Sequence, residues 1–265
     1  MSLRREFEKW KKDNQQSGTL AWARFAMFDF ILCTNQVSKE FILKGGHLLW
    51  KRIRIQRGTT DLDYAMREAR SDIAEDLRAA CSQSSKFEFV MESLKKGTIN
   101  TRAGFTAVIC FREKERSQED KRYTPEGRLI GYSKFTIDIG FDPDVDSEEM
   151  MIDGEPIHVA SIVNIFLDKL DACTRRGSEN TRIKDFDDLV RIIRSDEKVD
   201  RKHLVRLAGL RGIPLKVDTD IADPGFRKVW SRYHEIEYRG GSEVFPEEPL
   251  QAIEIINEYL SETER

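Results

Sequence analysis

Histidine, cysteine and proline are scarce in this sequence of 265 residues, which contains 4, 4 and 7 of them. Disulfide frameworks and zinc sites need cysteine or histidine at short, repeated spacings. The histidines here are dispersed, and no two cysteines form a C-x-x-C pair. The sequence therefore predicts buried thiols in a reducing compartment and argues against a Cys/His metal site. The cysteines are Cys33, Cys81, Cys110 and Cys173.

Long hydrophobic runs are also missing. The most apolar stretch, Leu20 to Cys33, is interrupted by Arg24 and Asp29 and is too short to span a bilayer. The N-terminal segment MSLRREFEKWKKD is charged and has no apolar signal-peptide core behind it. We therefore expect no membrane association and a cytoplasmic location.

The chain lacks an excess of charge of one sign, since 44 basic and 47 acidic residues leave a net charge of −3. Any affinity for nucleic acid must therefore come from a local basic patch. With 39% hydrophobic and 34% charged residues the chain is typical of a globular protein with a charged surface. Its length suits one large domain or two modest ones.

Patterns typical of strands and helices divide the sequence into two halves. Strand patterns and two helical ones, at 20–34 and 66–82, fill the first half, and helical patterns fill the second. The acidic segment around 145–158 separates the strand patterns from the helical ones. It therefore predicts an α+β region at 1–155 and a helical region at 156–265. The predicted strands are 40–44, 60–65, 86–94, 104–112 and 129–141. The predicted helices of the second half are 160–175, 185–195, 200–209, 224–234 and 249–262.

Three aspartates have spacings suited to a metal site. Residues i and i+2 of a strand share a face, so Asp61 and Asp63 point the same way with Leu62 turned into the sheet. In SKFTIDIGFD, alternation places Asp138 opposite the apolar side chains. Converging carboxylates bind Mg²⁺. The alternative, ordinary solvent-facing positions, stays open for all three.

A glycine pair and a basic segment precede these aspartates. Gly45-Gly46 follows the strand at 40–44, where glycine lets the backbone approach a phosphate and a following helix N-terminus adds N–H groups. A plain turn is the alternative. Lys51, Arg52, Arg54 and Arg57 could accept a triphosphate or an RNA backbone, or could form a solvated basic face.

These motifs resemble the AbiEii/AbiGii-type nucleotidyltransferase toxins, within the nucleotidyltransferase superfamily. The match rests on LKGG at 43–46, R-x-T-T-D-L-D at 57–63 and I-D-I at 137–139. Residues 160–189 add a lysine in an apolar helix, Lys169, then Arg175 or Arg176, then KDFDDL at 184–189. The departures are His47, where the family pattern has a small residue, and an extended charged segment at 112–128.

The resemblance implies a nucleotidyltransferase-like mixed β-sheet with flanking helices, followed by a helical C-terminal domain that completes the active site. Lys169 would contact phosphate or base, while Asp185 and Asp188 would complete the site or brace Lys169. From the residues alone, Lys169 could instead snorkel from its helix, and Asp185 could be a helix N-cap. Asp138 would also help to deprotonate the attacking hydroxyl. The implied ligands of Mg²⁺ (or Mn²⁺) are Asp61, Asp63 and Asp138, and Gly45 and Gly46 would hold the triphosphate. Further candidate nucleotide-binding residues are Lys51, Arg57 and Thr60.

The implied activity is transfer of NMP from an NTP to an acceptor hydroxyl, with a tRNA 3′ end or other RNA as the candidate acceptor. The implied role is the toxin of a bacterial toxin–antitoxin or abortive-infection system, with a cognate antitoxin as partner. Two alternatives remain: a nucleotidyltransferase that modifies a small molecule or a protein hydroxyl, and a non-catalytic NTP-binding module.

Overall fold

The computed structural model describes residues 2–14, 20–54, 59, 61–99, 102–114, 129–176, 183–238 and 245–262. It separates into two compact units. The first unit comprises Met1–Leu48 and Gly58–Ala160, and the second comprises Leu49–Arg57 and Ser161–Arg265.

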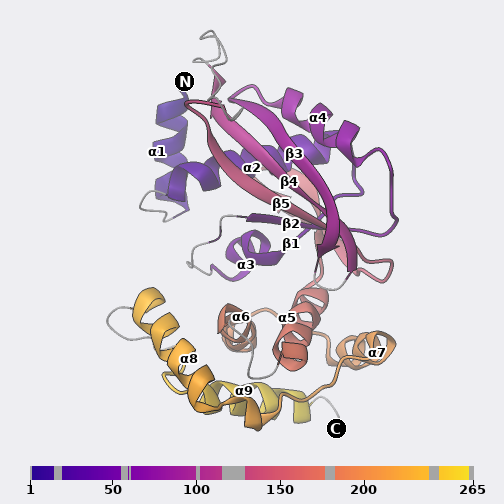
Figure 1. Cartoon of the computed structure of the whole chain (residues 1–265), viewed down its shortest axis with the longest axis vertical. Coiled ribbons are helices and arrows are strands. Elements are labelled where there is room, and N and C mark those ends of the chain that lie inside the picture. The colour runs from indigo at the N-terminus through magenta and orange to yellow at the C-terminus, as the bar shows by residue number, and fades with distance from the viewer. Residues whose placement is uncertain are drawn as a thin grey trace. The chain divides into compact units, whose positions relative to one another are not determined.

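A mixed sheet forms the centre of the first unit (Figure 1). Among the described residues it has seven strands in the order β3-β4-β5-β2-β1-β7-β6. The pairs β2–β5 and β1–β7 are parallel and the others are antiparallel. The strands are β1 (Ile42–Lys44), β2 (Asp61–Met66), β3 (Phe87–Ile99), β4 (Arg102–Glu113), β5 (Ser133–Phe141), β6 (Ser147–Ile152) and β7 (Glu155–Ala160).

Helices α2 (Leu20–Val37) and α4 (Ile73–Gln83) contact each other and the same sheet, so they cover one face of it (Figure 1). The core between them is aromatic, with ring contacts such as Phe30 to Phe89 at 5.0 Å. Helix α1 (Leu3–Asp13) packs on α2. Helix α3 (Gly45–Ile53) begins in the first unit and ends in the second.

The second unit is helical. Helix α6 contacts α5, α8 and α9, and α7 contacts α5. Phe186 of α6 packs against Phe226 and Trp230 of α8 at 5.5 and 5.8 Å between ring centroids. The helices are α5 (Ile162–Arg176), α6 (Ile183–Arg194), α7 (Arg201–Arg211), α8 (Pro224–Glu237) and α9 (Pro249–Ser261).

The predicted α+β region followed by helices is confirmed, with two local corrections. The segment 145–158, expected to lie outside the sheet, forms most of the hairpin β6–β7, which turns at Asp153 and Gly154 with positive φ. The helix expected at 66–82 begins only at Ile73, because β2 continues to Met66. Within the described ranges no helix combines the length and the apolar character that crossing a membrane requires.

The four cysteines are free thiols in the structure. Cys33, Cys110 and Cys173 are buried and Cys81 is half-buried. Burial raises the pKa of Cys33 to about 12 and that of Cys81 to about 11, so both stay protonated at neutral pH.

Candidate active site

Contacts with α2 show which side chains of β2 and β5 lie on the face of the sheet that this helix covers. The hydroxyls of Thr34 on α2 and Tyr64 on β2 are hydrogen-bonded at 2.9 Å. Phe30 of α2 packs on Phe135 of β5 at 5.6 Å. Because side chains alternate along a strand, the aspartates of β2 and β5 point to the face opposite α2.

One row of residues crosses four strands on this face. The parallel register of β2 and β5 pairs Asp63 with Asp138. On one side Lys44 of β1 pairs with Asp63, and on the other Thr106 of β4 pairs with Asp138. Directly paired residues share a face, so the row Lys44–Asp63–Asp138–Thr106 presents two carboxylates between a cation and a hydroxyl.

Asp61, Asp63 and Asp138 form the group of acidic side chains that could hold a metal ion among the described residues. One carboxylate oxygen from each lies within 4.8 Å of the others, and all three residues are half-buried. Oxygen ligands of this kind suit Mg²⁺ or Mn²⁺, and a half-buried cluster leaves coordination positions for water or phosphate. Like charges at this spacing repel each other, so the arrangement favours a bound cation.

Gly45 opens α3 directly beside this cluster. Its φ is +71°, and a Cβ at this position would lie 1.9 Å from Asp63 Oδ2. Backbone and carboxylate are therefore in contact, which only glycine permits here. Gly46, the second predicted glycine, lies in the first turn of α3. The helix N-terminus, where backbone N–H groups favour anions, thus begins at the edge of the carboxylate cluster.

Two further residues hold Asp61. His47, the departure from the family pattern, is buried to 1% exposure and its Nδ1 lies 3.0 Å from the Asp61 carbonyl oxygen. Thr59 donates a hydrogen bond from Oγ1 to Asp61 Oδ1 at 3.1 Å. The imidazole therefore ties the first turn of α3 to the start of β2, a role that a small residue could not fill.

Thr106 holds Asp138 in the same way, from the neighbouring strand. Its Oγ1 donates to Asp138 Oδ1 at 2.7 Å. A fixed carboxylate presents its other oxygen in a defined direction, as groups that orient metal ligands do.

Thr106→Val, which keeps the shape but removes the hydroxyl, is expected to raise the Mg²⁺ concentration for half-maximal transfer by about 10-fold, because outer-shell partners of metal ligands typically contribute this much. Thr106→Ser retains the donor and should stay close to wild type. A metal titration of the initial rate checks both variants. Equal behaviour of valine and serine would contradict the positioning role.

The second unit contains the other predicted residues. Lys169 of α5, 8% exposed, places Nζ 2.9 Å from Asp185 Oδ1 and 2.8 Å from Asp188 Oδ2. Asp185 and Asp188 are one turn apart on α6 and thus share a face. Lys169 does not snorkel to the solvent, because its ammonium group is paired with these two buried carboxylates. Asp185 is not the N-cap of α6, because this helix begins two residues earlier, at Ile183. The contacts are those expected if both aspartates brace Lys169.

Asp187, between the two, points elsewhere. It accepts hydrogen bonds from Arg191 Nε at 2.7 Å, from the Tyr233 hydroxyl at 2.9 Å and from the Tyr238 hydroxyl. Burial lowers the pKa of Arg191, but Asp187 and Tyr238 raise it by more, so this guanidinium stays charged. The motif KDFDDL thus has two faces, one toward Lys169 and one toward α8.

Lys169→Met is expected to destabilise the protein by about 3–5 kcal/mol, since it leaves two buried carboxylates without this cation. Urea unfolding measures the change. Lys228→Met, at an exposed position of α8, should change the free energy of unfolding by less than about 0.5 kcal/mol. A triple variant that also carries Asp185→Asn and Asp188→Asn should recover much of the loss, and no recovery would contradict this explanation.

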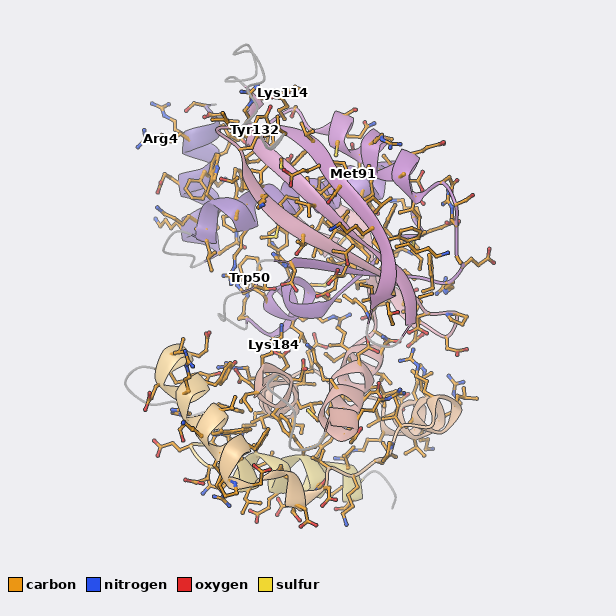
Figure 2. All side chains as sticks on the ribbon, viewed as in Figure 1. Arg4, Trp50, Met91, Lys114, Tyr132 and Lys184 are labelled. Carbon is orange, nitrogen blue, oxygen red and sulfur yellow. The ribbon has the colours of Figure 1, made fainter. Side chains whose placement is uncertain are left out.

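Of the remaining predicted residues, Lys51 belongs to the second unit, and the others lie outside the described residues. Lys51 lies over the ring of its neighbour Trp50 at 5.3 Å, in the second unit. Figure 2 labels Trp50 on α3 and Lys184 on α6. Arg57, Thr60 and most of the charged segment 112–128 lie outside the described residues. Sequence reasoning missed Lys44, His47, Thr59 and Thr106 as site residues.

Fold and site together define the class of protein: a mixed sheet with paired strand aspartates, a further aspartate on an adjacent strand and a glycine turn is the arrangement of a nucleotidyltransferase. In sequence, residues 27–253 match the family described as Nucleotidyl transferase AbiEii toxin, Type IV TA system. The chain belongs to this family and is a nucleotidyltransferase. The alternative of a non-catalytic module is thereby set aside.

Solved structures agree on the fold. A crystal structure of a candidate nucleotidyltransferase from H. pylori is 16% identical, with a TM-score of 0.54 over 94% of this chain and 100% of that one. JHP933 from Helicobacter pylori is 15% identical, with a TM-score of 0.50 over 90% and 93% of the two chains. At this identity the likeness concerns the fold alone. No curated protein sequence matches significantly.

Proposed function

We propose that this protein is the toxin of a type IV toxin–antitoxin system and transfers NMP from an NTP to a hydroxyl of RNA, with a tRNA 3′ end as the first candidate. The observation that carries the proposal is the convergence of Asp61, Asp63 and Asp138 beside the Gly45 turn. A cognate antitoxin, an abortive-infection role and a cytoplasmic location follow from the family and belong to the proposal.

The three carboxylates fit a divalent cation, Mg²⁺ or Mn²⁺, which when bound neutralises charge on the phosphate oxygens. In the proposed reaction the acceptor hydroxyl forms a bond to the α-phosphorus, and the bond from that phosphorus to the pyrophosphate oxygen breaks. Asp138 accepts the hydroxyl proton, and Thr106 holds this carboxylate in place. The N–H groups at the start of α3 donate hydrogen bonds to the triphosphate oxygens, so the protein mainly positions its reactants.

Lys169 is the proposed phosphate or base contact from the second unit, braced by Asp185 and Asp188. Gly46, Lys51, Arg57 and Thr60 are the further proposed nucleotide-binding residues. Family resemblance supports the roles of Lys169, Gly46, Arg57 and Thr60, and the two ion pairs of Lys169 give its ammonium group a fixed direction. Lys51 is proposed only for its positive charge after the glycine pair.

The proposal is tested by incubating the protein with each α-labelled NTP, Mg²⁺ and total tRNA, then separating RNA, protein and small molecules. Label should enter RNA with the wild type and not with Asp61→Ala. Absence of transfer by the wild type with all four NTPs, or equal transfer by Asp61→Ala, would contradict the catalytic assignment.

A second candidate function keeps the chemistry but changes the acceptor to a protein or small-molecule hydroxyl. The net charge of −3 favours it, because dedicated RNA-binding proteins usually carry a basic excess. Label in the protein or small-molecule fraction, with unlabelled RNA, would establish this alternative.

A further inference from the structure

A basic hollow lies in the second unit, and none of the residues that line it has been assigned to catalysis. It is a cavity of about 600 Å³ between the end of α3 and the segment after α6. Four cations line it, Arg52, Arg54, Arg194 and Lys198, together with the acidic Asp196 and Glu197. The whole chain is slightly acidic, with a net charge of −3, so this excess of positive charge is local.

Arg52 forms the wall of the basic hollow. Its side chain is 8% exposed, and Nη1 lies 3.4 Å from Glu197 Oε2. This distance exceeds the usual 2.7–2.9 Å of a charge-assisted hydrogen bond. Burial lowers the pKa of Arg52, while Glu197 raises it, and an arginine remains charged in either case. A fixed positive charge therefore faces the cavity.

Helix ends alone do not explain the other cations. Arg194 lies in the last turn of α6, where a basic side chain favours the helix dipole. Lys198 is four residues beyond that helix, outside the range of the dipole. Arg54 follows α3 with φ at +57°, a left-handed conformation that glycine or asparagine adopts more readily. The backbone conformation at this position does not favour arginine, so local structure does not explain why a cationic side chain is found here.

Arg54 and Lys198 are exposed and their charged groups are accessible. Within the described residues, neither has an ion pair. The adjoining cavity beyond Arg194 is lined by Glu247, Glu248, Glu254 and Glu258. An anionic ligand is therefore confined to the basic side of Arg194.

We propose that the basic hollow binds the phosphodiester backbone of the RNA that accepts the nucleotide. A triphosphate concentrates about four negative charges, which Asp196 and Glu197 would repel at close range. A polynucleotide carries one charge per phosphate and can place single phosphates between the cations while avoiding the acids. The choice of RNA as ligand rests on the proposed function; the anion-binding character rests on the residues of the hollow.

The test measures binding of fluorescently labelled total tRNA to the full chain by anisotropy, without NTP, at several salt concentrations. Arg54→Gln/Lys198→Gln should weaken binding about 10-fold and reduce the slope of log K against log salt by about 2, one for each phosphate that is no longer neutralised. Arg52 is left intact, because its loss could disturb folding. The matched control is Lys228→Gln/Arg232→Gln, which removes the same charge from exposed positions of α8 in the same unit.

The control pair should bind tRNA within about twofold of the wild type. Equal losses for both pairs would attribute the effect to overall charge and overturn the proposal, and so would unchanged binding by the hollow pair. Calorimetry with ATP and Mg²⁺ should give wild-type affinity for the hollow pair, and a comparable loss there would make the hollow a nucleotide site instead. None of these measurements requires turnover. They therefore test the RNA-binding role of the hollow separately from the transfer reaction, and either one can fail without the other.

Discussion

Asp63→Asn is expected to lower the rate of nucleotidyl transfer by about 10³-fold or more at saturating NTP, since a bound cation contributes several kcal/mol of transition-state stabilisation. Asparagine has the same size but lacks the negative charge that a hard cation prefers. Asp63 stands between Lys44 and Asp138 in the row across the sheet, at the centre of the proposed site. The initial rate of pyrophosphate release measures the effect.

Asp153→Asn is the matched control. Asp153 is exposed in the β6–β7 turn with φ at +52°, a conformation that asparagine also tolerates, so the rate should not change. Asp63→Asn should also leave the free energy of unfolding in EDTA unchanged or raised, because it relieves repulsion among three carboxylates. A variant that unfolds more easily but retains more than about a tenth of the activity would indicate a structural role for Asp63 instead.

Gly45→Ala is expected to reduce transfer by about 100-fold, because its Cβ would lie 1.9 Å from Asp63 Oδ2 and must displace either this carboxylate or the first turn of α3. Both groups belong to the proposed site, so either shift misplaces a ligand of the cation or the N–H groups for the phosphates. The positive φ adds a conformational penalty of about 1–2 kcal/mol to folding.

Gly212→Ala separates these two effects. Gly212 has φ at +61° at the end of α7, and a Cβ there would find open space within 4 Å among the described residues. It should therefore show a similar loss of stability with nearly wild-type activity. Equal activities of the two variants would show that the contact between Gly45 and Asp63 does not matter for the reaction.

The face of the sheet on which the three aspartates lie was predictable, because the alternation of side chains along a strand determines it. Phe135, Ile137 and Ile139 alternate with Asp138 in the sequence, and the structure confirms that these apolar side chains are buried on the side of α2. Asp63 and Asp138 are far apart in the chain, however, and their pairing depends on the order of β2 and β5 in the sheet. No local pattern specifies such a pairing; the family resemblance provided it.

Residues that act only through a neighbour were not predictable. Thr106 looks like any threonine of a strand, and its contact with Asp138 exists only in the register of β4 and β5. His47 could be noted as a departure, but its bond to the Asp61 carbonyl needs the fold of α3 over β2. The hairpin β6–β7 was missed because its acidic, exposed residues look like those of a linker. Such residues are compatible with a strand here, because β6 is the last strand of the sheet and edge strands commonly carry charged side chains.

The most direct test of the account is metal binding by the three aspartates. Calorimetric titration of Mn²⁺ into the metal-free full chain, without nucleotide, should show saturable binding that Asp138→Asn weakens by about 10-fold or more and that Asp61→Asn/Asp63→Asn abolishes, since each variant removes charged oxygen ligands. Asp153→Asn should bind as the wild type does. Equal Mn²⁺ binding by the wild type and the double variant would contradict the central claim that Asp61, Asp63 and Asp138 form the catalytic metal site.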